Sequence, residues 1–297
     1  MAHSKRCRET LSLKDSKQPW SPVNRKLVTG AVAVSAMTAL GACGSPSDTK
    51  PAARGDRSSS SSTTSAGYEV SAIAVAADGS VDGRILATRM SDAMLASKSV
   101  HATSDGTPSN TGAVAGESDF EFSNPVKVAM KFSMKGMNLE AVAVGGLVYI
   151  KGIPGTTKPW LKVDPKGNDA FSVAMSSVAG LSKSADPRLL NVLIGGIKGH
   201  YLGTEQVGGV WTGRFSFQLS MSALPAGLTA RPGMEGAHVA MDYWVGDDNL
   251  PRKVTTVIEV DGKKESTGST YSGWGKPVNI VAPPATQVGP PPPCRSF

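Results

Sequence analysis

Cysteine is scarce in this chain, which has three in 297 residues: Cys7, Cys43 and Cys294. Cys7 lies close to the first residue, and Cys294 lies in a proline-rich stretch near the last one. No pair of cysteines therefore remains in the long middle part, and this excludes a disulfide framework there. That part must be stabilised by an ordinary hydrophobic core, which a domain of about 200 residues can form.

The residue patterns of common catalytic and metal sites are also missing. The four histidines share no spacing, and the sequence has no His-Glu-x-x-His, no paired-cysteine motif and no Gly-x-Ser-x-Gly. A glycine-rich loop ending in Gly-Lys-Ser or Gly-Lys-Thr is absent too. Aromatic residues make up only 6% of the chain and are scattered, which disfavours a stacking platform for nucleic acid. We therefore expect no enzyme, no metal, no cofactor and no nucleic-acid partner.

No hydrophobic run is long enough for a permanent membrane helix, which needs about 20 residues. The longest one, Leu27 to Ala39, follows Arg25 and Lys26 and is typical of a secretory signal. The next residues, Leu40-Gly41-Ala42-Cys43, resemble a bacterial lipobox, in which the cysteine takes a diacylglycerol and becomes the new N-terminus. The alternative is an ordinary signal peptide followed by a chance cysteine. The lipobox predicts lipidation at Cys43 and a protein held on the outer face of the cytoplasmic membrane.

The high calculated pI of 9.3 mostly describes the signal. Residues 1–42 hold seven of the 31 Lys and Arg and two of the 24 Asp and Glu. The remaining chain has 24 basic and 22 acidic residues, so its charge does not indicate a nucleic-acid partner.

Composition divides the rest of the chain into three parts. Residues 43–67 contain the lipidation site and a linker rich in Ser, Thr, Ala and Gly, which cannot bury enough apolar surface to fold. Residues 68–284 have the patterning of a folded domain. Residues 285–297 form a proline-rich tail.

Periodicity within the domain changes from helical to extended and back. Residues 84–100 have apolar side chains three and four apart, with Asp82 as a possible N-cap, and are predicted to be a helix. One-faced strands follow, with a hairpin turn predicted at Gly145-Gly146, then a helical block near residues 171–194, then further strands from residue 210. The pattern predicts an α+β fold in which helices lie on one side of an antiparallel sheet.

Several ordered motifs resemble one family. They are Lys98-Ser99-Val100-His101, Pro159-Trp160-Leu161-Lys162-Val163-Asp164, Asp242-Tyr243-Trp244-Val245, Asn249-Leu250-Pro251-Arg252-Lys253-Val254 and the run from Tyr271 to Ile280. Together they are similar to the actinobacterial LppX/LprG-type lipoproteins, relatives in fold of the LolA and LolB carriers. The resemblance covers residues 84–284. It implies a strongly curved antiparallel half-barrel with helices on its concave face, and an apolar cavity that holds acyl chains.

The resemblance also implies a lipid or glycolipid ligand, carried or presented within the cell envelope, with a transporter or another lipoprotein as a possible partner. Methionine and phenylalanine suit an adaptable apolar site, and we expect eight of them to line the cavity: Met90, Met94, Met130, Phe132, Met134, Phe215, Phe217 and Met241. A packed core has the same sequence signature as the wall of a lipid pocket. The alternative function is a protein-binding or sensory lipoprotein with a filled core.

Overall fold

The computed structural model describes residues 75–106, 115–134, 137–164, 166, 172, 180–220, 237–260 and 262–290. The predicted signal, Cys43 and the linker up to residue 67 lie outside these residues, as does most of the helix expected near residues 171–181.

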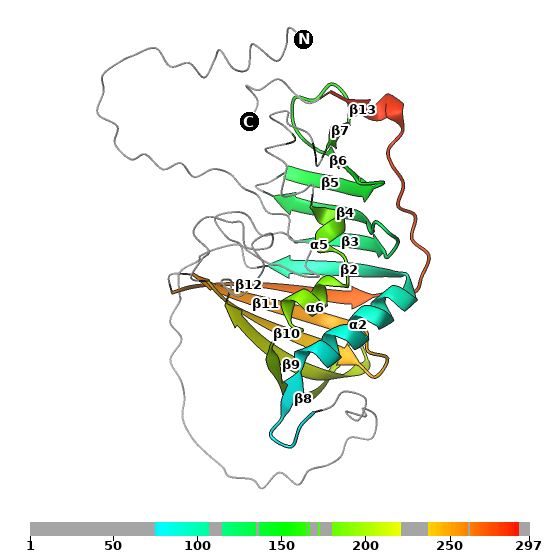
Figure 1. The fold of residues 1–297 in the computed structure, drawn as a ribbon. Helices are drawn as coiled ribbons and strands as arrows, with labels where there is room; N and C mark the ends of the chain where they lie inside the picture. Colours follow the sequence, from blue (N-terminus) through cyan, green and yellow to red (C-terminus); the bar gives the residue numbers. More distant parts are fainter. Residues whose placement is uncertain are drawn as a thin grey trace, which may run out of the picture.

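The described strands form one large, curved sheet (Figure 1). Its order is β1-β8-β9-β10-β11-β12-β2-β3-β4-β5-β6-β7-β13. The strand bounds are Ser80–Asp82 (β1), Ser99–Gly106 (β2), Ala115–Glu121 (β3), Lys127–Met134 (β4), Met137–Val144 (β5), Leu147–Lys151 (β6), Trp160–Val163 (β7), Lys198–Val207 (β8), Val210–Ser220 (β9), His238–Gly246 (β10), Pro251–Val260 (β11), Lys263–Ser272 (β12) and Val288–Gly289 (β13).

The predicted antiparallel sheet is confirmed, because every described strand pair is antiparallel except the pair β7 and β13. The predicted hairpin also forms: Gly145 and Gly146 have φ angles of 60° and 77° between β5 and β6. Such angles suit a tight hairpin turn and favour glycine. At the far edge of the sheet, β13 pairs with β7, so ordered structure continues past residue 284.

Three α-helices of the described chain accompany the sheet: α2 (Gly83–Ser97), α5 (Leu181–Ser184) and α6 (Leu189–Leu193). A short 3-10 helix, η3 (Ala285–Gln287), precedes β13. The carboxylate of Asp82 accepts a hydrogen bond from the Arg84 backbone N–H at 2.8 Å, which confirms the predicted N-cap. The helix ends three residues earlier than predicted, because Lys98 takes the left-handed conformation with a φ of 68° and the chain then enters β2.

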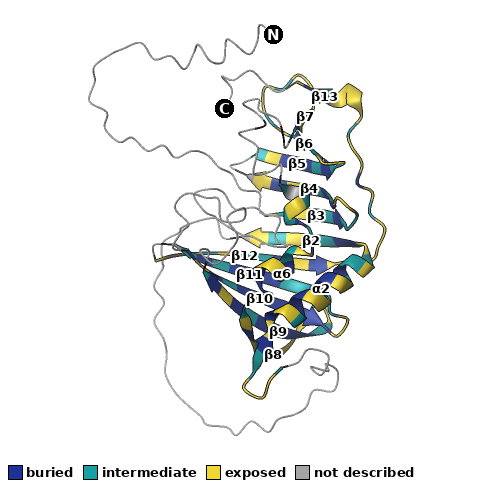
Figure 2. Ribbon diagram, viewed as in Figure 1, coloured by how far each residue is buried: buried dark blue, intermediate teal, exposed yellow. Residues whose placement is uncertain are grey.

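Helix and strand side chains meet in one hydrophobic cluster. Figure 1 shows α2 and α6 in front of the same side of the sheet, and α5 contacts β4 and β5. Buried and more exposed residues alternate along the strands (Figure 2), as a sheet with one covered face requires. We call the helix-bearing side the inner face; it carries Phe217, Met241, Ala102, Met130 and Ile150 on successive parts of the sheet.

Candidate functional site

The inner face holds the residues predicted from the sequence. Side chains that are at most 5% exposed and belong to the hydrophobic cluster are those of Met90, Met94, Met130, Phe132, Phe215, Phe217 and Met241. Met134 is the last residue of β4, and its side chain is outside the described part. The seven therefore share one apolar layer between strands and helices.

The sheet separates these residues into two groups. On one side, Phe217 of β9 lies opposite Met241 of β10, and Phe215 lies opposite Tyr243. On the other side, β4 carries Met130 and Phe132. Five strand steps of about 4.8 Å separate β10 from β4, which corresponds to about 24 Å measured along the curved sheet.

Aromatic side chains that the sequence reasoning missed extend the first group. Tyr243 is fully buried, meets the Phe217 ring edge-on with centroids 6.1 Å apart, and donates its hydroxyl to Met241 Sδ at 3.5 Å. Burial raises the pKa of Tyr243 far above its ordinary value. Tyr271 of β12 is also buried, and both burial and the nearby Tyr243 raise its pKa. In the sequence, apolar and polar residues alternate from His238 to Val245, and this alternation already placed Tyr243 on the same side of the strand as Met241.

A stack of rings closes the end of the layer where β12 leaves the sheet. Tyr271, Trp274, Phe122 and Phe120 follow one another with centroid distances of 6.0, 6.2 and 6.5 Å. Trp274 also donates its indole N–H to the Pro251 carbonyl oxygen at 3.2 Å. These contacts fix the chain after β12 against the sheet, and offset stacking of this kind adds stability beyond buried area.

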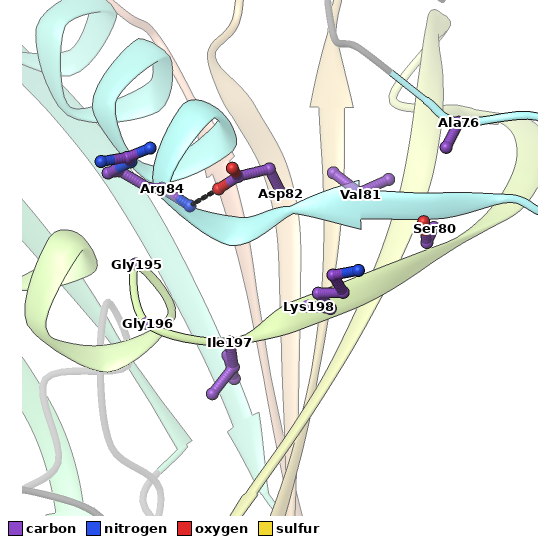
Figure 3. A pocket seen from close by; sticks show the side chains of 9 residues that line it. All are labelled: Ala76, Ser80, Val81, Asp82, Arg84, Gly195, Gly196, Ile197 and Lys198. Atoms are coloured by element: carbon purple, nitrogen blue, oxygen red, sulfur yellow. Dashed lines mark hydrogen bonds between the residues drawn. The ribbon is translucent and has the colours of Figure 1, made fainter.

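A cavity of about 440 Å³ opens at the β1 edge of the sheet (Figure 3). Its wall is apolar where Ala76, Val81 and Ile197 line it, and charged where Arg84 and Lys198 do. Its volume is within the usual range for small-molecule sites. Val81 belongs to the hydrophobic cluster and also lines this cavity, so the cavity lies beside the apolar layer.

The other side of the sheet is polar and carries charge pairs. Arg214 donates from Nε to the Asp242 carboxylate at 3.1 Å, and its guanidinium lies 4.8 Å from the Trp244 ring centre. Lys253 Nζ lies 4.7 Å from the same ring centre, and the Trp244 indole N–H donates to Glu205. Asp242, on the same face of β10 as His238, is thus held in an ion pair with Arg214.

No group of three or more His, Cys, Asp or Glu side chains gathers to hold a metal ion within the described residues. Among the helices that the structure describes, none combines the length and apolar character that a membrane span requires.

No protein-family model matches the sequence, and no characterised protein sequence matches it. Solved structures with a similar fold include the lipoprotein LppX of Mycobacterium tuberculosis, with 16% identity, a TM-score of 0.45 and coverage of 67% of this chain and 98% of that chain. LprF of Mycobacterium bovis has 15% identity, a TM-score of 0.44 and coverage of 68% and 96%. The MucA/MucB complex of Pseudomonas aeruginosa has 14% identity, a TM-score of 0.32 and coverage of 70% and 60%.

In fold, the chain thus resembles LppX-type lipoproteins, the type that the sequence motifs had indicated.

Proposed function

We propose that this chain is a membrane-anchored envelope lipoprotein that binds the acyl chains of a lipid or glycolipid between its curved sheet and its helices. In this reading the inner face is the concave face, and the protein carries or presents its ligand without chemistry. One observation supports the proposal above others. A single apolar cluster extends across the inner face from Val81 of β1 to Val163 of β7, far beyond the breadth of any one described helix.

Burial of acyl chains supplies the driving force. Each methylene group that leaves water contributes about 0.8 kcal/mol, so a chain of sixteen carbons brings on the order of 12 kcal/mol. Met90 and Met94 on α2, with Met130 and Met241 on the sheet, provide unbranched thioether side chains that can repack around such a chain.

Entry of a ligand requires the helices to move relative to the sheet, because Met90 and Met94 are at most 3% exposed. The contact of α2 with α6 includes a hydrogen bond from the Thr88 hydroxyl to the Asn191 side-chain oxygen at 3.0 Å. Lys98, in the left-handed conformation, separates α2 from β2 and is a natural point for the helix to pivot.

The second candidate is a protein-binding lipoprotein with a filled core. The close burial of the seven cluster residues, each at most 5% exposed, favours it. Large apolar side chains exposed on the described surface are Val192, Leu202 and Val281, which lie on separate parts of the fold and form no common patch.

Native mass spectrometry of the full chain, purified from its own membranes, separates the two candidates. A lipid that remains bound supports the carrier. Absence of lipid in repeated preparations, together with no binding of a fluorescent fatty acid, would overturn it and leave the protein-binding function.

The anchor has its own test. Cys43→Ser removes the thiol that the lipobox predicts to be acylated, and we expect the protein to move from the membrane fraction to the soluble fraction. Cys294→Ser is the matched control and should stay with membranes. A Cys43→Ser protein that remains membrane-bound would show that the lipobox interpretation is wrong.

A further inference from the structure

Positive charge is concentrated on the helix-bearing side of the described fold. Residues 83–98 and 180–197, which contain α2, α5 and α6, carry five Lys and Arg and two Asp. The other described residues carry 13 Lys and Arg and 14 Asp and Glu, so they have no positive excess. We call the exposed side chains of these two ranges the helix surface. Its basic residues are Arg84, Arg89, Lys98, Lys183 and Arg188.

The cations of the helix surface differ from those of the sheet in their partners. Among the described residues, six of the seven close contacts between basic and acidic side chains join strands and turns of the sheet. On the helix surface, Arg188 pairs with Asp186 at 2.8 Å, and the other four cations form no ion pair with a described residue. Asp92, exposed on α2, forms none either. A net positive charge is thus available to an external partner.

An exposed apolar side chain accompanies these cations. Val192 of α6 is 44% exposed, although most large apolar side chains of the described fold are covered. Its neighbour Asn191 accepts the hydrogen bond from Thr88 of α2, so the two helices lie against each other, and Figure 2 shows exposed residues along both. Cations together with apolar side chains are typical of a protein surface that lies on an anionic bilayer.

The chain enters the fold beside the helix surface. β1 ends at Asp82, and α2 begins at Gly83. The predicted linker, residues 44–67, has 24 residues, and a flexible chain of that length has a root-mean-square span of about 27 Å. A lipid on Cys43 would therefore keep α2 near the bilayer, where attraction between cations and anionic headgroups acts within about 10 Å and can orient the domain.

We propose that the helix surface docks on an anionic phospholipid membrane, with Arg84, Arg89, Lys98 and Lys183 at the headgroups and Val192 entering between them. A membrane fits better than a small anion, because Arg84 and Lys98 are separated by about 20 Å along α2. Docking turns the helices that cover the apolar layer towards the membrane. The inference goes beyond the proposed function, since it concerns orientation and does not require a bound lipid cargo.

The test measures binding to lipid vesicles by co-sedimentation. The parent protein is residues 43–297 with Cys43→Ser, which contains the whole described fold, so neither the predicted signal nor an acyl chain contributes. It should bind vesicles of phosphatidylglycerol and phosphatidylcholine more tightly than vesicles of phosphatidylcholine alone. This preference should vanish in about 1 M salt, where the screening length is about 3 Å. Arg84→Gln/Arg89→Gln should weaken binding to the anionic vesicles about 5- to 25-fold.

Two further variants make the test specific for this surface. Lys131→Gln/Lys162→Gln removes the same charge from exposed side chains that alternate with buried ones on β4 and β7, and these lysines lie on the side of the sheet opposite to the helices. This matched control should bind within about 2-fold of the parent. Asp92→Lys adds positive charge to the helix surface and should strengthen binding to anionic vesicles about 5- to 25-fold.

Each result bears on the inference. Equal weakening by the two double variants would overturn it, because net charge alone would then explain the binding. A parent protein without preference for anionic vesicles would overturn it as well. The urea midpoints of all variants should match that of the parent. If Arg84→Gln/Arg89→Gln is less stable, Asp92→Lys decides, and a failure to strengthen binding sinks the inference. Native mass spectrometry of bound lipid is independent of these results, so the carrier function can stand where docking fails.

Discussion

Gly83, the first residue of α2, provides a sharp test of how the helices are held on the sheet. Its backbone N–H donates to the Ile197 carbonyl oxygen at 3.1 Å. A Cβ atom at this position would lie 2.0 Å from the Ile194 carbonyl oxygen and 2.5 Å from that of Ile197. Both contacts are to backbone, so no side chain can turn aside to make room.

The size of the effect follows from these distances. An ordinary carbon–oxygen contact is about 3.3 Å or longer, so Gly83→Ala must displace the start of α2 or the loop before β8 by more than about 1 Å. Overpacking of this kind costs about 1–3 kcal/mol, and a weakened backbone hydrogen bond adds about 0.5–1.5 kcal/mol. Alanine is the better helix former by up to about 1 kcal/mol, which offsets part of the loss. We expect a net destabilisation of about 2–3 kcal/mol.

Urea denaturation followed by far-ultraviolet circular dichroism measures this change. With a slope of about 1–3 kcal/mol per molar urea, the midpoint should fall by about 0.7–3 M. Gly196→Ala, in the same loop, is the control: a Cβ there meets nothing within 4 Å, and its φ is not left-handed. This variant should be as stable as the wild type or slightly more stable. An unchanged midpoint for Gly83→Ala, or an equal fall for both variants, would refute the reasoning.

Three further predictions concern the apolar layer and the outer face. Phe217→Ala should lower the free energy of unfolding by about 3–5 kcal/mol, since the ring is fully buried, and urea titration would show this as a lower midpoint; a change below about 1 kcal/mol would mean that the ring is not packed. Stability should fall as pH rises above about 10, because unfolded tyrosine ionises there while Tyr243 and Tyr271, with raised folded pKa values, stay neutral. Below pH 10 their contribution is complete; above it, each removes up to about 1.4 kcal/mol of stability per pH unit, and Tyr243→Phe should make the fall of urea-derived stability with pH shallower by up to that amount. Asp242→Asn should cost only about 1 kcal/mol in the same assay, since Arg214 is 40% exposed, and a loss above about 3 kcal/mol would contradict a solvent-screened pair.

Local features of the fold could be predicted because they depend on neighbours in the sequence. The alternation in β4 and β10, the cap at Asp82 and the turn at Gly145-Gly146 each follow from side-chain chemistry within a few residues. The same alternation predicted which side of each strand is buried, and hence that Phe217 and Met241 lie in the apolar layer.

Only the tertiary structure decided which of those buried residues meet. The order of strands across the sheet separates Met241 from Met130 by five strand steps, and no local pattern contains that order. The clash that Gly83 avoids comes from carbonyl groups more than a hundred residues away. The stack of Tyr271, Trp274, Phe122 and Phe120 likewise exists only because pairing of β12 with β2, and of β2 with β3, brings these parts of the chain side by side.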